Sequence, residues 1–254
     1  MAFTTGTALL LVGIGFAVGA FGTLVGAGGG FILTPVLLLL YPQDSPRTIT
    51  AISLAVVFFN AASGSIAYAR QRRIDYRSGI VFALATLPGA VGGAFLVGQV
   101  SRHLFDGIMG GVLALLAVWL LLGERWPLPQ PENPLRRGAL YSLVVGFVSS
   151  FLGIGGGVIH VPLLVRALGF PMHLATATSH FVLAVMAGAG TITHVALGSF
   201  AHGHGWRRTA ALSVGVVAGA QLGAHVSLRL RGAVIQWLLA AALLALAARL
   251  LLAA

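Results

Sequence analysis

The sequence contains no cysteine, no lysine and only five acidic residues among 254. The absence of cysteine excludes a disulfide framework, a thiol nucleophile and a thiolate metal site. The acidic residues fall in expected loops or at the ends of apolar segments; they are Asp44, Asp75, Asp106, Glu124 and Glu132. We therefore expect no carboxylate inside a membrane. This argues against a cation site built on Asp or Glu and against paired-carboxylate catalysis.

Charged residues of either sign are scarce, and hydrophobic residues predominate. Charged residues make up 8% of the chain, hydrophobic residues 58%, and the mean hydropathy is +0.98. Soluble domains carry about 25% charged residues, so the composition predicts an all-α polytopic membrane protein. We interpret residues 7–25 as its first membrane segment, because no small-x-small cleavage site of a signal peptide is evident there.

The formal net charge is +10, and all fifteen basic residues are arginine. The arginines are scattered over short loops between apolar segments, rather than gathered into a patch that would bind nucleic acid. This pattern is typical of positive-inside topology and of attraction to anionic lipid. We expect no nucleic-acid partner, and we expect contact with membrane lipid.

Two glycine clusters interrupt the apolar sequence. The first is Gly26-Ala27-Gly28-Gly29-Gly30, followed by Pro35, and the second is Gly153-Ile154-Gly155-Gly156-Gly157, followed by Pro162. Glycine disfavours a helix by about 1 kcal/mol per position relative to alanine, so each cluster predicts a break. Broken helices within a membrane are tolerated only where the backbone is buried in protein or lines a cavity. A pair in corresponding halves indicates a transporter binding site.

Between these breaks and the loops, the chain divides into eight to ten apolar helical segments. We expect them at about 7–25, 28–41, 47–69, 76–100, 103–122, 138–152, 155–168, 173–197, 206–228 and 232–252. The segment at 28–41 has about 14 residues and reaches roughly 21 Å. A bilayer core is about 30 Å thick. This segment and its counterpart at 155–168 are therefore expected to be half-length or re-entrant.

The order of segments repeats, and two further motifs repeat with the glycines. Thr50-Ala51-Ile52-Ser53 matches Thr176-Ala177-Thr178-Ser179, and residues 88–94 match residues 218–224. We therefore predict an N-terminal repeat at 1–122, a proline-rich linker at 123–137 and a C-terminal repeat at 138–254. The count of arginines does not distinguish parallel from inverted halves. We favour inverted halves by analogy with other broken-helix transporters.

Each helix that starts after a break would present free N–H groups and a positive dipole end, which suit an anion. The glycines also allow close approach of a ligand to the backbone. We therefore predict that substrate contacts Gly28, Gly29, Gly30, Gly155, Gly156 and Gly157. The alternative is tight helix packing by small residues, without any ligand.

Side chains near the breaks add candidate contacts. His173, Thr176, His180, Thr191 and His194 share one helical stripe, which should face the bundle interior. From this stripe we select His180, together with the adjacent Ser179, and we expect His173 and His194 to lie near the interface. His180 could attract an anion or carry a coupled proton. The alternative for His180 is a neutral histidine that is hydrogen-bonded between helices, and a hydrogen bond between helices is also the alternative for Asn60 and Gln221. The remaining candidates are Thr34, Ser53, Asn60, His160 and Gln221.

No catalytic residues, cofactor or metal site are predicted. A Ser-His-Asp set cannot be assembled, because no acidic residue is expected at membrane depth. His202 and His204 are two residues apart in a loop, but no carboxylate accompanies them, so we do not assign a metal to them. These features argue against an enzyme.

The doubled glycine motif, with its prolines and Thr176-Ala177-Thr178-Ser179, resembles the TauE/SafE family of sulfite and organosulfonate exporters, a group extending to 4-toluene sulfonate uptake-type permeases. The resemblance covers nearly the whole chain. It implies the transport of a small sulfur-containing anion across the cytoplasmic membrane. In this chain the second half has Thr178-Ser179-His180 where the first has Ile52-Ser53-Leu54. Which half supplies the polar contacts therefore stays open.

The hypothesis is a secondary transporter that exports sulfite or an organosulfonate such as sulfoacetate by alternating access, with proton coupling as an added hypothesis. The alternatives are a channel-like anion pore and an importer of an organic sulfur compound. A membrane-embedded enzyme is disfavoured. The exact anion, the direction, the coupling ion and the oligomeric state, including a homo-oligomer, stay open.

Overall fold

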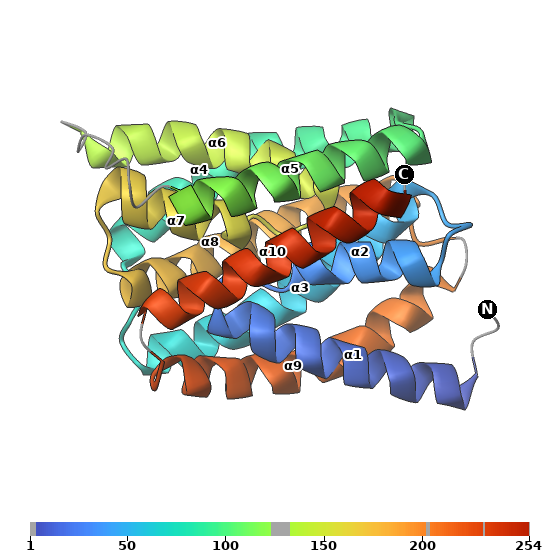
Figure 1. Ribbon diagram of the computed structural model, residues 1–254, viewed down its shortest axis with the longest axis horizontal. Helices are drawn as coiled ribbons and strands as arrows, with labels where there is room; N and C mark the ends of the chain where they lie inside the picture. The colour runs from blue at the N-terminus through green and yellow to red at the C-terminus, as the bar shows by residue number, and fades with distance from the viewer. Residues whose placement is uncertain (1–3, 123–132, 202–203, 231, 254) are drawn as a thin grey trace.

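The structure is a computed structural model, and it describes residues 4–122, 133–201, 204–230 and 232–253. These residues form α-helices, one 3-10 turn and short connections, as Figure 1 shows. The all-α membrane fold predicted from composition is confirmed. Within the described residues, seven helices are long and apolar enough to cross a membrane: α1, α3, α4 with η1, α5, α6, α8 and α9.

The helices follow the expected segments closely. The first half contains α1 (Thr5–Leu24), α2 (Gly30–Leu40), α3 (Pro46–Arg70), α4 (Tyr76–Leu96), η1 (Val97–Gln99) and α5 (Arg102–Leu122). The second contains α6 (Pro134–Leu152), α7 (Gly157–Leu168), α8 (Met172–Ala196), α9 (Gly205–Ser227) and α10 (Gly232–Ala253). The two short helices, α2 and α7, are the segments that follow the glycine clusters.

One boundary differs from expectation. Helix α6 begins at Pro134, four residues before the expected start at 138. Asn133 explains the difference, because its side chain accepts a hydrogen bond from the backbone N–H of Arg136 at 3.1 Å and so caps the helix. Proline is also well suited to the first helical position. Residues 134–137 therefore belong to α6, and the rest of the expected linker, except Asn133, lies outside the described residues.

The helices of the two halves interleave rather than forming separate bundles. Helix α1 packs along α9, and the corresponding helix α6 packs along α4. Helix α3 packs against α8 at the centre, and α5 packs against α10. Each contact thus has a counterpart in which the roles of the halves are exchanged. The centre of the molecule is therefore built jointly by both halves.

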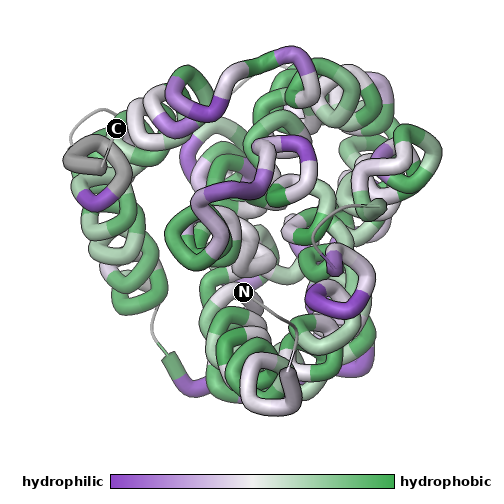
Figure 2. Tube along the Cα trace, turned by 90° about the vertical axis from the view of Figure 1, so that its right-hand side faces the viewer, coloured by the Kyte–Doolittle hydropathy of each residue, from purple (hydrophilic) through white to green (hydrophobic). Residues whose placement is uncertain are grey.

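Apolar side chains cover the outside of the bundle. Leu9, Leu115 and Ile192 are 69%, 69% and 71% exposed, and many other large apolar side chains are also exposed. Figure 2 shows the predominance of hydrophobic residues along the helices. A soluble protein seldom exposes so much apolar surface, whereas a bilayer accommodates it.

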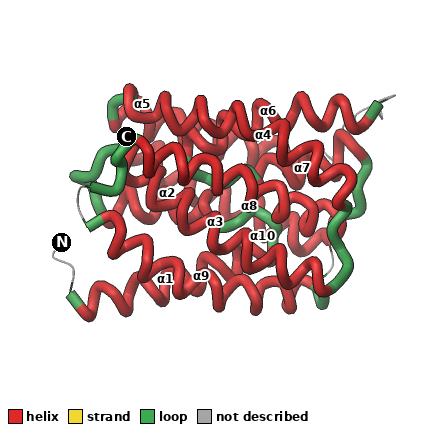
Figure 3. The backbone as a smooth tube through the Cα atoms, turned by 180° about the vertical axis from the view of Figure 1, so that it is seen from behind, coloured by secondary structure: helices red, strands yellow, loops and turns green. Residues whose placement is uncertain are grey.

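Most connections lie at the two ends of the bundle, while the two glycine breaks lie inside it (Figure 3). At the end where α1 begins and α10 ends, which we call the terminal end, the turn between α2 and α3 contacts the start of α5. There Arg102 donates hydrogen bonds to the carbonyls of Leu38 and Asp44. At the opposite end, Arg73 after α3 donates to the carbonyl of His173 at the start of α8. Corresponding turns, α2–α3 and α7–α8, therefore lie at opposite ends.

Candidate functional site

The two breaks have the backbone geometry that glycine permits. Gly26, Gly28 and Gly29 have φ angles of 75°, 73° and 76°, and Gly153, Gly155 and Gly156 have φ angles of 69°, 79° and 70°. Residues with a Cβ rarely adopt this left-handed region. The sequence spacing of the glycines therefore corresponds to the same chain path in both halves, and it ends one helix and starts another inside the bundle.

The two breaks touch each other. A Cβ added to Gly30 would lie 2.7 Å from the carbonyl group of Ile154, and one added to Gly157 would lie 2.6 Å from the Cα of Ala27. Both separations are shorter than a carbon atom allows, so only glycine fits. The starts of α2 and α7 therefore meet at the centre of the molecule, and the space available for a ligand lies beside the breaks rather than between them.

The repeated Thr-Ala-x-Ser motifs pack on the breaks of the opposite half. Thr176 of α8 lies against Gly26, where an added Cβ would be 2.9 Å from its Cα. Thr50 of α3 lies against Gly153, with a corresponding separation of 3.0 Å. This reciprocal contact explains why the two motifs occur together in each half: each supports the other half's break.

A buried polar cluster surrounds the first break. Asn60 donates to the carbonyl of Gly28 at 2.9 Å and accepts from the hydroxyl of Thr23 at 3.1 Å. The same hydroxyl lies 3.2 Å from Nε2 of His180. Tyr68 donates to the Thr23 carbonyl at 2.6 Å. Because the Thr23 proton goes to Asn60, His180 Nε2 is the donor to Thr23. This cluster holds the first break in shape through bonds within the protein.

Thr34 and Ser53 support the second break. Their hydroxyls donate to the carbonyl of Gly153 at 2.8 and 2.7 Å, and the two oxygens lie 2.9 Å apart. Both side chains are fully buried. The sequence predicted both as ligand contacts, and in the structure both bind the backbone of the opposite half.

A small cavity lies beside the start of α7. Its volume is about 10 Å³, which is near the minimum that one water molecule needs. Its lining includes Gly156, Gly157, His160 and Ser179, together with Thr86, Val145, Val182, Leu183 and Met186. The structure thus brings four of the predicted site residues to one cavity, at the positive end of a helix.

Two polar groups of this cavity have hydrogen-bonding capacity left over. Within the described part of the chain, Ser179 Oγ and His160 Nδ1 are buried and have no hydrogen-bond partner. The Ser142 hydroxyl donates to the carbonyl of Gly138 at 2.7 Å, so His160 Nε2, 3.1 Å from that hydroxyl, must be the donor to Ser142. Nδ1 of neutral His160 is therefore an acceptor, and it becomes a donor when the ring is protonated.

Gln221 is not part of this centre. It is exposed on α9, and its side-chain amide donates to the carbonyl and hydroxyl of Ser63 on α3, at 2.9 and 2.8 Å. The residue links α9 to α3 instead of facing the cavity.

His194, expected near the interface, lies two residues before the end of α8. Its side chain is fully buried, and its Nδ1 lies 3.1 Å from the hydroxyl of Ser199. After α8 the chain turns at Gly198, whose φ is 68°, and the Ser199 N–H bonds the His194 carbonyl. The connection therefore folds back over the helix end and covers the histidine.

Sequence reasoning missed Thr23, Tyr68, Thr86 and Ser142. A signal existed for Thr23, because it precedes Gly26 by three residues, just as Ser150 precedes Gly153. Tyr68, Thr86 and Ser142 carry no comparable pattern, since their roles depend on which helices become neighbours.

Comparison with known proteins decides the family. The model of the family described as "Sulfite exporter TauE/SafE" matches residues 11–250. The chain belongs to this family. It is 28% identical over 251 residues to the "Probable membrane transporter protein YunE" of Bacillus subtilis, an alignment covering 88% of this chain and 89% of that protein. A "Probable membrane transporter protein" of Methanocaldococcus jannaschii is 28% identical over 192 residues, 73% of this chain and 72% of that protein. No solved structure matches.

With the apolar helices, these similarities make this TauE/SafE chain an integral membrane protein of the cytoplasmic membrane and a membrane transporter. The names of its relatives point to transport rather than to an enzymatic reaction. Among the described residues no group of three His, Cys, Asp or Glu side chains could hold a metal ion.

Proposed function

We propose that this transporter exports a small sulfur oxyanion or organosulfonate, such as sulfite or sulfoacetate, by alternating access around the crossed breaks. The observation that carries the proposal is the meeting of two helix starts, Gly30 of α2 and Gly157 of α7, at the centre. Both present the positive end of a helix dipole, which favours an anion. The described acidic residues, Asp44, Asp75 and Asp106, lie in end turns or near a helix start, so no described carboxylate opposes an anion at the centre.

The cavity beside α7 is the proposed binding site. Ser179 supplies a free hydroxyl donor, and glycine backbone groups line the wall next to it. At about 10 Å³ the cavity is too small for sulfite. Binding therefore requires the helices around it to separate, as an alternating-access cycle does. In this proposal Thr34, Ser53, Asn60 and His180 shape the two breaks, and the substrate contacts belong to Ser179, His160 and the glycines.

His160 is the histidine we assign to proton coupling. It lines the cavity, whereas His180 is bonded within the polar cluster at the first break. Neutral His160 offers a lone pair at Nδ1, which repels an anion, and the protonated ring offers a donor and a positive charge. Anion binding would thus favour proton uptake at the same site.

Inverted halves and the orientation of the molecule are also part of the proposal. The opposite placement of the α2–α3 and α7–α8 turns supports inverted halves. Of the described arginines, eight lie toward the end opposite the termini: Arg70, Arg72, Arg73, Arg77, Arg136, Arg137, Arg166 and Arg229. The terminal end has Arg47, Arg102, Arg207, Arg208 and Arg249. The positive-inside rule then assigns the eight-arginine end to the cytoplasm.

The proposal is tested by reconstituting the purified protein in liposomes and measuring sulfite and sulfoacetate flux, with and without a pH gradient. Saturable flux of either anion is expected, and it should respond to the gradient. Absence of saturable flux of both would remove the substrate claim. Anion movement from the cytoplasm-facing end to the other end, against an anion gradient, would indicate export. Movement in the opposite direction would indicate import of an organic sulfur compound.

A further inference from the structure

The terminal end of the molecule holds a second polar cavity, separate from the central breaks. Its volume is about 310 Å³, and it lies between the first turn of α3 at 45–48, the η1 turn with Val100, and residues 197–199. This volume is at the lower end of the range for small-molecule sites in proteins. The cavity is thus large enough for a small dissolved ion together with several water molecules.

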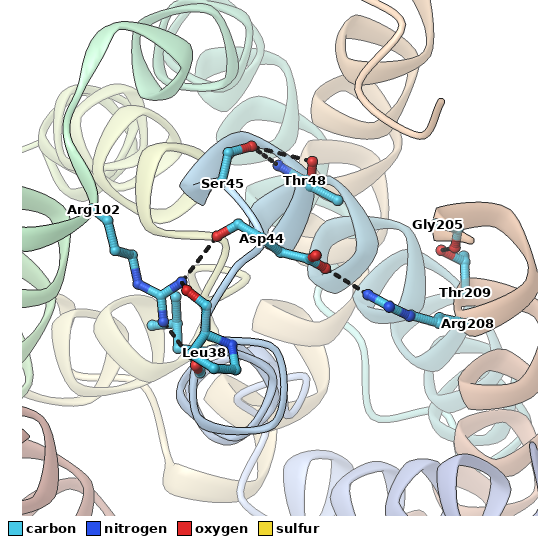
Figure 4. Close-up of polar contacts among 9 residues, drawn as sticks. Leu38, Asp44, Ser45, Thr48, Arg102, Gly205, Arg208 and Thr209 are labelled. Carbon is cyan, nitrogen blue, oxygen red and sulfur yellow. Dashed lines mark hydrogen bonds and ion pairs between the residues drawn. The ribbon is translucent and has the colours of Figure 1, made fainter. Parts of the chain in front are cut away.

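Arg47 lines this cavity and has no acidic partner. The two described acidic residues of the terminal end are already paired, Asp44 with Arg208 and Asp106 with Arg102. Figure 4 shows Asp44 pointing toward Arg208, with Arg102 bound to the carbonyls of the same turn. Within the described residues, Arg47 Nε is buried without a hydrogen-bond partner. Arg47 as a whole is half-buried, but a buried donor atom left without a partner is uncommon in proteins and calls for an explanation.

The walls of the cavity leave room for the guanidinium and contribute a further polar group. A Cβ at Gly98 would lie 2.6 Å from Arg47 Nε and 2.7 Å from its Cζ, so the absence of a side chain at Gly98 makes the space for the guanidinium. Ser199 also lines the cavity, and its hydroxyl lies 3.1 Å from the ring of buried His194. The positive end of α3 faces the same space, because the helix starts there at Pro46.

We propose that this cavity binds a small oxyanion through Arg47, as a second anion site at the outer mouth of the transporter. The guanidinium offers a planar fork of N–H donors that matches two oxygens of one oxyanion. The unpaired charge excludes a cation and favours an anion of one or two negative charges. The identity of the anion and the placement of this site on the outer side of the membrane rest on the proposed function. The site itself is inferred from Arg47 and the cavity that it lines.

The test is calorimetric titration of the purified full-length protein in detergent with sodium sulfite and, separately, sodium sulfate. Arg47→Gln is expected to weaken binding at one site by tenfold or more. Arg207→Gln is the matched control, because Arg207 is an exposed arginine at the same end and does not line the cavity. Its binding should equal that of the unaltered protein. Because Arg47 Nε has no hydrogen-bond partner among the described residues, the thermal midpoint of Arg47→Gln should also stay unchanged.

Equal binding by Arg47→Gln and the unaltered protein would overturn the site, as would equal weakening by Arg207→Gln, since a general surface charge would then explain the effect. Binding of short-chain phosphatidylglycerol but of neither anion would replace a dissolved oxyanion with a lipid headgroup and would also overturn it. Should Arg47→Gln fail to fold, Arg47→Lys keeps the charge but loses the fork, and an intermediate affinity is expected. Calorimetry measures binding without transport. If the protein showed no sulfite flux but still bound the anion through Arg47, the proposed function would be refuted and the anion site would stand.

Discussion

Polar side chains near the breaks fall into two kinds. Asn60, Thr34 and Ser53 donate hydrogen bonds to backbone carbonyls of the breaks, so these donors are already used within the protein. Ser179 and His160 line the cavity, and Ser179 Oγ and His160 Nδ1 have no hydrogen-bond partner among the described residues. A buried group that loses its partner destabilises the fold, whereas a buried group without a partner can be removed at little expense to stability. The two kinds therefore predict different mutant phenotypes.

Asn60→Ala should destabilise the fold. The change removes the side-chain donor to the Gly28 carbonyl and the acceptor of the Thr23 hydroxyl proton, and each unsatisfied buried group costs about 1–3 kcal/mol. The thermal midpoint of the purified protein in detergent measures the effect. Gln221→Ala is the control, and a smaller shift is expected because Gln221 is exposed. Equal midpoints for Asn60→Ala and the unaltered protein would contradict the role assigned to Asn60.

His160→Gln should abolish the response of sulfite flux to a pH gradient, since glutamine cannot take up a proton. The matched variant is His180→Gln, at a histidine bonded to Thr23 outside the cavity. It should keep the response, even if its rate falls. Flux is measured in liposomes at fixed sulfite with the gradient imposed or collapsed. A gradient response that survives in His160→Gln would remove proton coupling from this residue.

At the level of elements, the central feature is the crossing of two broken helices. Gly157 lies against the backbone of Gly26 and Ala27, and Gly30 lies against Ile154. Each of these glycines faces backbone of the opposite break, which cannot rotate away as a side chain can. The crossing should therefore be intolerant of a single added methyl group.

Gly157→Ala should disrupt the crossing and lower both stability and flux. Overpacking of a close-packed interior costs about 1–3 kcal/mol, and backbone contact places this case toward the upper part of that range. Gly13→Ala in α1 is the matched control, because a Cβ there would meet nothing within 4 Å. Alanine is also favoured over glycine in a helix by about 1 kcal/mol. Similar thermal midpoints for the two variants would contradict the crossing.

The glycine clusters were sufficient to predict approximately where α1 and α6 end and where α2 and α7 begin, because a run of glycines has a direct local effect on helix stability. They could not predict that the breaks touch, since contact between halves depends on how all the helices pack. For the same reason Thr34 and Ser53 were expected to contact a ligand, although they bind the Gly153 carbonyl. The exposed position of Gln221 and its bonds to Ser63 were likewise not predictable, because a polar residue beside small residues can face inward or outward.

Nothing in the local sequence marked Arg47 as special. It is one of fifteen arginines, and its lack of a partner becomes visible only when the pairing of Asp44 and Asp106 is known. The buried position of His194 likewise depends on the turn at Gly198. The position of a single polar side chain was therefore predictable from the sequence only where a repeated motif marked it.

For the whole molecule, the exchange of partners between halves matters most. Helix α1 packs on α9 and α6 on α4, so each half completes the other, and corresponding turns lie at opposite ends. In the inverted arrangement that we propose, one central site would open toward either side by equivalent movements. The arrangement therefore makes a prediction about which turns face outward.

Single cysteines can test the orientation cleanly, because the chain contains no native cysteine. Gln43 and Pro171 are exposed residues in the corresponding α2–α3 and α7–α8 turns. In intact cells, a membrane-impermeant maleimide should label Gln43→Cys but not Pro171→Cys, and permeabilised cells should label both. Labelling of both variants in intact cells would contradict inverted halves, and labelling of Pro171→Cys alone would reverse the orientation.

The central claim is that a sulfur oxyanion binds beside the crossed breaks and passes from one side to the other. Counterflow of radiolabelled sulfite into sulfite-loaded liposomes tests it most directly, because a channel does not support counterflow. The unaltered protein should accumulate label transiently, and Ser179→Ala should reduce the initial rate about tenfold. Ser65→Ala is the control, at a buried serine that also lacks a partner among the described residues but does not line the cavity, and it should retain the full rate. Absence of counterflow in the unaltered protein, or equal rates in the two serine variants, would contradict the account.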